Sequence, residues 1–151
     1  MSMEALINSE LLIEHFTTRA NELPGKLQKL VTESGMITQG NIQDETPVRT
    51  GNAQSSIRRE NLGNFSVRIF PDLGIAPYVE WLIRGTEPHE IVPVNAKALY
   101  WKGADHPVKK VMHPGTAANP FFDIGIQNSR SDIDAEVELF TSWLIGESDD
   151  Y

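Results

Sequence analysis

Histidine is the residue type in this chain with the clearest capacity for chemistry, because an imidazole titrates near neutral pH and ligates metals. Three of the four histidines, His89, His106 and His113, lie in the central region. With Asp105 or Glu90 they would supply the groups of a small metal-dependent hydrolase. No helical H-E-x-x-H motif is present, however, and the prolines after His106 and His113 favour loop positions. We therefore expect hydrogen-bonding loop histidines and keep the hydrolase as an alternative.

Motifs for other reaction types are missing from the sequence. No glycine-rich phosphate loop follows a predicted strand, and no G-x-S-x-G elbow presents a serine nucleophile. The chain has no cysteine, which excludes disulfides, thiolate zinc sites and cysteine nucleophiles. We therefore expect no catalytic residue, no metal and no cofactor, and we predict that the protein is not an enzyme.

Length and charge narrow the class of protein further. The 151 residues are 40% hydrophobic and 23% charged, which is typical of one folded domain spanning 1–151. Thirteen basic against twenty-one acidic residues give a net charge of −8, which disfavours tight binding to phosphate backbones. An acidic channel wall would instead let a DNA duplex pass without sticking. The sequence has no signal peptide or apolar stretch of membrane-spanning length, so we expect assembly in a cytoplasm and no membrane partner.

The first part of the chain has a helical pattern. Apolar residues recur every three or four positions from residue 4 to about 45, and Pro24 is expected to kink or divide this region. A period of two then predicts a β-hairpin, with one strand starting at Ala53, a turn at Gly63-Asn64 and a second strand from Phe65.

The second part of the chain predicts shorter elements. A helix with Pro77 at its first position should end at Gly85, and segments 89–94, 96–102 and 109–112 should be extended. Asn119-Pro120 is expected to cap a long amphipathic helix that ends near residue 146, before an acidic tail at 147–151. Residues 1–45 are thus helical, 46–118 mainly strands and loops, and 119–146 helical.

Two groups of side chains are candidates for a subunit interface. Arg58, Arg59 and Arg68 across the predicted hairpin would form a basic patch, either a solvated face or a partner for acidic residues of a neighbouring subunit. Large aromatic rings supply core area in a small domain and are also enriched at interfaces. The aromatic candidates are Tyr78, Trp81, Tyr100, Trp101, Phe121 and Phe122.

Four segments carry residues with architectural roles, since prolines stop helices and glycines permit sharp turns. The segments are Thr46-Pro47-Val48-Arg49-Thr50-Gly51; Tyr78-Val79-Glu80 with Arg84-Gly85-Thr86; Ile91-Val92-Pro93 with Ala96-Lys97-Ala98-Leu99-Tyr100-Trp101; and His113-Pro114-Gly115-Thr116-Ala117-Ala118-Asn119-Pro120-Phe121-Phe122. In this order they resemble the head-to-tail joining (neck, tail-component or tail completion) family of long-tailed bacteriophages. The chain departs from the usual family pattern at Trp81-Leu82-Ile83-Arg84, which adds residues before Gly85.

The resemblance implies an α+β domain with a small twisted antiparallel sheet, flanked by N-terminal helices and a long C-terminal helix. It also implies a structural virion protein that forms a homo-oligomeric ring in the neck. Such a ring would join the head-closure (stopper) protein to the tail terminator or tail tube, with viral DNA passing through the lumen without specific binding. A tail terminator or minor capsid protein of the same particle is the nearest alternative.

Overall fold

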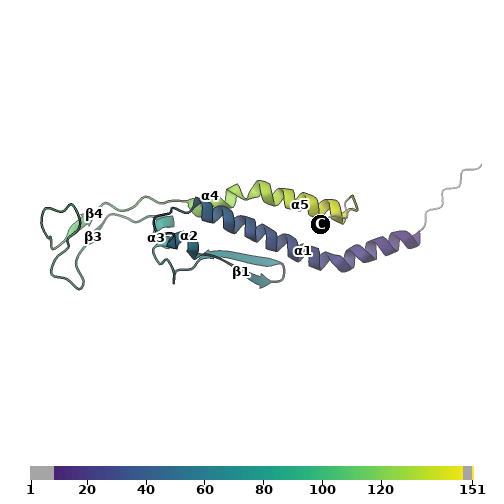
Figure 1. Cartoon of the computed structure of the whole chain (residues 1–151), viewed down its shortest axis with the longest axis horizontal. Helices are drawn as coiled ribbons and strands as arrows, with labels where there is room; N and C mark the ends of the chain where they lie inside the picture. The colour runs from purple at the N-terminus through teal and green to yellow at the C-terminus, as the bar shows by residue number, and fades with distance from the viewer. Residues whose placement is uncertain (1–8, 148–150) are drawn as a thin grey trace, which may run out of the picture.

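In the computed structural model, which describes residues 9–147 and 151, the chain is elongated around one long central helix (Figure 1). A β-hairpin flanks this helix on one side and two C-terminal helices flank it on the other. The fold is α+β, as expected from the sequence. These elements are α1 (Ser9–Glu45), β1 (Ile57–Gly63), β2 (Ser66–Pro71), α4 (Phe121–Asn128) and α5 (Arg130–Leu144).

Helix α1 is a single element of 37 residues that continues through Pro24. Figure 1 shows a bend in its first half, the half that contains this proline, which removes one backbone hydrogen bond. Of the two expected outcomes at Pro24, the structure therefore has a bend and not a division into two helices. The helix ends at Glu45, as predicted, and the buried Thr46 Oγ1 donates a 2.6 Å hydrogen bond to the carbonyl of Ile42. The predicted residues 4–8 lie outside the described part of the chain.

The hairpin begins later than the sequence pattern indicated. Residues 52–56 form a short helix, α2 (Asn52–Ser56), in place of the strand expected from Ala53. Gly51 precedes it at φ 81°, and the Ser56 hydroxyl donates to the Ala53 carbonyl at 2.7 Å, which favours a helical turn over an extended backbone. Phe65 has φ 55° and lies in the turn, not in the second strand.

The hairpin packs against α1 at a glycine. A Cβ atom on Gly35 would lie 2.7 Å from Cγ1 of Val67 in β2, so only glycine lets the hairpin come this close. Arg59 Nη1 then donates a 2.9 Å hydrogen bond to the carbonyl of Thr32, and Gln39 Nε2 donates one of 2.9 Å to Ile57. Gly35 is thus a packing position between α1 and the hairpin.

Helices α4 and α5 return along the other side of α1 and are separated only by Ser129. Asn119 does not cap α4, because the capping position is Pro120 and no side chain bonds there. The backbone N–H of Asn119 instead donates to the carbonyl of Leu82 at 3.0 Å. This bond connects the start of α4 to the short helix α3 (Val79–Arg84). The described part of the expected acidic tail is limited to residues 147 and 151.

The core lies where α1, the hairpin and α4 meet. Its buried members are Ile42, Ala53, Ile57, Ala76, Val79 and Phe121, with Ile69, Leu82, Ile83 and Phe122 packed against them. Because these residues come from both helical and hairpin segments, the core holds the two sides of the fold together.

Residues 86–118 form a long arm that extends away from the helices at one end of the molecule (Figure 1). It follows helix α3 (Val79–Arg84), which ends at Gly85 as predicted but starts two residues after Pro77. The arm contains two antiparallel strands, β3 (His89–Ile91) and β4 (Val111–His113), paired His89 to His113. The segments expected to be extended at 89–94 and 96–102 are therefore mostly irregular loop beyond β3. Within this loop an isolated antiparallel bridge pairs Leu99 with Val108.

Candidate interaction surface

The base of the arm is closed by two of the four sequence segments. Backbone N–H groups of Thr86 and Thr116 donate to each other's carbonyls at 2.9 and 3.1 Å. Gly85 has φ 73° and Gly115 has φ 88°. A Cβ atom on Gly85 would lie 2.6 Å from the carbonyl oxygen of Thr116, and one on Gly115 would overlap the carbonyl oxygen of Thr86. The predicted glycines are therefore required by both conformation and space.

A hollow of about 300 Å³ lies between the first and the second sequence segments. It lies between the turn after α1 and helix α3, and Pro47, Thr50 and Gly51 line it opposite Tyr78 and Leu82. Gly51 provides the positive φ that was expected at this turn. Three of the four segments therefore meet around α3, and they do so mainly through backbone turns.

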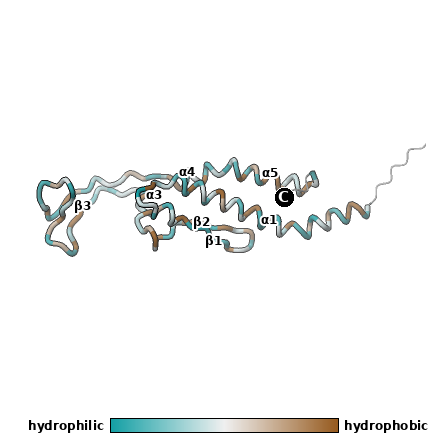
Figure 2. Tube along the Cα trace, viewed as in Figure 1, coloured by the Kyte–Doolittle hydropathy of each residue, from teal (hydrophilic) through white to brown (hydrophobic). Residues whose placement is uncertain are grey.

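The arm itself carries an apolar hollow of about 430 Å³. Tyr100 is 69% exposed and Trp101 is 48% exposed, and both line it together with Leu99 and Met112. Figure 2 shows apolar, brown stretches in this arm, which lies apart from the helices. Lys97, in the same loop, is also exposed. The third segment thus forms an exposed apolar surface and not part of the core.

The histidines of the arm make local hydrogen bonds. His89 and His113 face each other across the two strands, with ring centroids 5.1 Å apart. His113 Nδ1 accepts a 3.0 Å hydrogen bond from the N–H of Gly115, and His89 Nδ1 lies 2.8 Å from the carbonyl of Glu87. The residue after His113, Pro114, lines the apolar hollow. These contacts orient both rings within the arm.

A metal site of the kind considered for the histidines needs at least three ligands in one place. Across residues 9–147 and 151, no group of three or more His, Cys, Asp or Glu side chains has an arrangement that could hold a metal ion. His89, His106 and His113 are thus not assembled with Asp105 or Glu90 into such a group.

The three arginines do not form one basic patch. Arg59 faces α1, where it bonds to Thr32, whereas Arg58 and Arg68 lie on the opposite face of the hairpin. Arg68 is directly opposite Glu60, not Arg58 or Arg59, and it bonds Glu60 at 2.5 Å. Arg58 lies 4.0 Å from Asp72. The sequence order could not reveal these acidic partners, because the pairing register decides which residues meet across a hairpin.

The aromatic candidates divide between core and surface. Phe121 is buried and Phe122 packs beside it, with ring centroids 6.3 Å apart. Trp81 is 59% exposed, and its neighbour in α3, Glu80, forms a 3.1 Å ion pair with Arg84. The helix buries Val79 and leaves Tyr78 and Trp81 exposed, so of the two roles open to these aromatic residues the core role does not apply to them.

No family model, curated protein or solved structure matches this chain.

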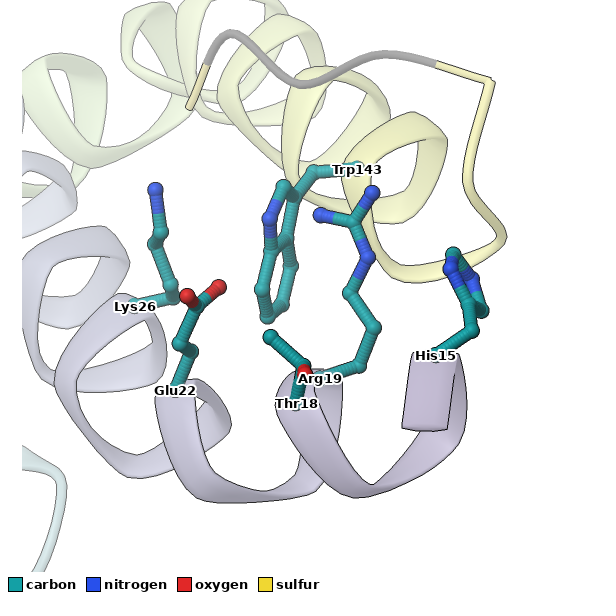
Figure 3. Close-up of a pocket in the computed structure, with 6 residues that line it drawn as sticks. All are labelled: His15, Thr18, Arg19, Glu22, Lys26 and Trp143. Carbon is teal, nitrogen blue, oxygen red and sulfur yellow. The ribbon is translucent and has the colours of Figure 1, made fainter. Parts of the chain in front are cut away.

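A further hollow, of about 410 Å³, lies between α1 and α5 at the end of the molecule opposite the arm. Figure 3 shows Trp143 of α5 with the side chains of Arg19 and Lys26 from α1 on either side of it. The Arg19 guanidinium carbon is 4.9 Å from the Trp143 ring centroid and Lys26 Nζ is 5.4 Å away. Sequence reasoning missed this contact, although the seven-residue spacing of the two cations on one helix face was a usable signal.

The described helices also include none that is both long and apolar enough to cross a membrane.

Proposed function

We propose that this protein is a structural ring subunit in the neck of a tailed bacteriophage, located between the head-closure protein and the tail. One observation carries the proposal. Three of the four segments on which the family resemblance rests form one architectural unit, made of a tight turn, helix α3, the base of an arm and the start of α4, and the remaining segment lies on the arm. Their glycines and prolines shape the backbone, which is what a subunit acting through its shape requires.

The exposed arm supports the assembly part of the proposal. Aromatic side chains on a surface far from the core are typical of protein interfaces, and Tyr100 and Trp101 are such residues. A homo-oligomeric ring needs two different surfaces on each subunit, which an elongated chain with an arm at one end provides.

The net charge of −8 supports the relation to DNA. A ring of acidic subunits repels phosphates, so a duplex would pass through its centre without being held. We propose no reaction and no cofactor for this protein. A tail terminator or minor capsid protein of the same particle would use the same features, and its position in the particle would distinguish it from a neck ring.

The test is a null mutation of this gene in the phage that encodes it. The expected result is DNA-filled heads and complete tails that do not join, as seen by electron microscopy. Adding the purified full-length protein to the mutant lysate should restore joined particles. Cryo-electron microscopy of those particles should then locate the protein in the neck.

Two results would count against the proposal. Normally joined particles from the null mutant would exclude a required neck role. Density for the chain at the tail tip or in the capsid shell would favour another structural position. The matched control is the same null lysate supplemented with buffer, which should contain unjoined heads and tails.

A further inference from the structure

We propose that the arm of one copy binds helix α5 of a second copy, with Tyr100 and Trp101 as apolar anchors and the lysines of the arm loop facing Asp134 and Glu138. The arm loop is defined here as residues 92–110. This inference rests on the proposed ring function and names the contact that would build the ring.

Among the described residues, strands β3 and β4 of the arm pack mainly against each other. Its two strands have three residues each, and an isolated two-stranded hairpin is marginally stable in water. Tyr100, Trp101 and Met112 expose large apolar surfaces around the hollow of about 430 Å³. Covering this surface with another protein would remove apolar area from water and stabilise the arm.

The charge of the arm loop is opposite to that of α4 and α5. The loop has four lysines and one acidic residue, a net charge of +3, within a chain whose net charge is −8. Helices α4 and α5 have one arginine and five acidic residues, a net charge of −4. Opposite potentials of this kind select the partner and the orientation of an interface.

The charged groups available for this contact are exposed and unpaired within the described residues. Lys97, Lys102 and Lys109 of the arm loop make no ion pair there, whereas Lys110 is paired with Glu90 at 2.7 Å.

Asp134 and Glu138 are four residues apart, so they lie on the same face of α5. Both are exposed, and neither makes an ion pair in the part of the chain that the structure describes. Neutralising these carboxylates with lysines of an incoming arm is therefore compatible with the contacts already present.

A chain cannot make this contact with itself in the described conformation. Figure 1 shows the arm at one end of the molecule, with α4 between its base and α5, and the arm points away from both helices. The contact therefore joins two copies. Because the arm and α5 are different surfaces, the contact is head to tail, and repetition with a closing rotation produces a ring.

The test uses the absence of cysteine from the full chain. One copy carries Lys102→Cys and a second copy, with a larger tag, carries Asp134→Cys. Mild oxidation of the mixture should produce a disulfide-linked pair of the two different copies. The matched control replaces Asp134→Cys with Glu14→Cys, which removes the same charge from exposed α1 and should give at least tenfold less product.

Substitution of the anchor provides a second measurement. Trp101→Ala should weaken self-association by about 30-fold in analytical ultracentrifugation, since central aromatic residues dominate interface energies. Circular dichroism should show unchanged helix content, because Trp101 lies outside the core. The charge reversal Lys102→Glu should also weaken association, and combining it with a second copy carrying Asp134→Lys should restore it.

The outcomes separate this inference from the neck proposal. Equal linkage to Glu14→Cys, or undiminished association of Trp101→Ala, would overturn the arm contact. Rings that form without any Lys102 to Asp134 linkage would also overturn it and would leave the neck function standing. Joined particles from the null mutant would remove the neck function whether or not the two copies are linked.

Discussion

A Cβ atom on Gly125 of α4 would lie 2.5 Å from the Cα atom of Ile42 in α1. The two helices therefore touch backbone to backbone at this point, and both residues are buried. Close helix contacts of this kind require glycine, because any side chain would push the axes apart.

Gly125→Ala should accordingly destabilise the protein by about 1–3 kcal/mol, the usual cost of overpacking. The free energy of unfolding from urea denaturation measures the effect. The matched control is Gly40→Ala in α1, where nothing lies within 4 Å of the added Cβ. That change should stabilise by about 0.5–1 kcal/mol through the helix preference of alanine. Equal effects at the two positions would contradict the close contact.

Trp143 is predicted to anchor the end of α5 against α1. It is 1% exposed and lies beside Arg19 and Lys26, so Trp143→Ala should cost about 3–5 kcal/mol in the free energy of unfolding. Trp81→Ala, at an exposed tryptophan, should change stability by less than about 0.5 kcal/mol. Thermal denaturation of both variants tests this difference, and a large effect of Trp81→Ala would show that α3 has a further partner.

Gly115→Ala is predicted to disturb the base of the arm. The position combines φ 88° with overlap of the added Cβ and the Thr86 carbonyl oxygen, so the backbone pairing of Thr86 and Thr116 should be lost. Trypsin should then cleave at the arm lysines faster than in the unmodified protein. The matched control is Gly103→Ala, because Gly103 also has a positive φ but nothing lies within 4 Å of an added Cβ. This control shows the effect of backbone strain without the overlap. Unchanged cleavage of Gly115→Ala would argue against a closed base.

Tyr151 should be the last tyrosine to ionise. Burial raises the pKa of its phenol to about 12, and the negative charges of Glu33 and Glu136 add to this effect. Its contribution to stability is therefore complete below the ordinary pKa of about 10 and is lost as the pH rises towards about 12. Absorbance at the tyrosinate band should show a late transition that Tyr151→Phe removes. A single transition near the ordinary value would contradict the buried environment.

Local sequence signals predicted many element boundaries. Pro47 marks the end of α1 and Gly85 the end of α3. The turn predicted at Gly63-Asn64 lies one residue later, at Asn64-Phe65, because Gly63 still pairs with Ser66. Each of these signals acts through the conformation of one or two residues, so it needs no knowledge of the rest of the chain. Prediction was wrong at Ala53, where backbone and hydroxyl contacts after Gly51 produce a helical turn in an alternating sequence.

By itself the sequence determined the absence of cysteine chemistry and the acidic net charge, which follow from composition alone. It also indicated most glycine turns, because short-range sterics involve only neighbouring residues, and its resemblance to the neck family implied the α+β class that the structure has. Only the tertiary structure decided that Gly35 and Gly125 are packing positions, that Arg59 is separated from Arg58 and Arg68, and that Tyr100 and Trp101 stand on an exposed arm. Periodicity shows which residues share a face of an element. Which element covers that face depends on contacts between distant segments.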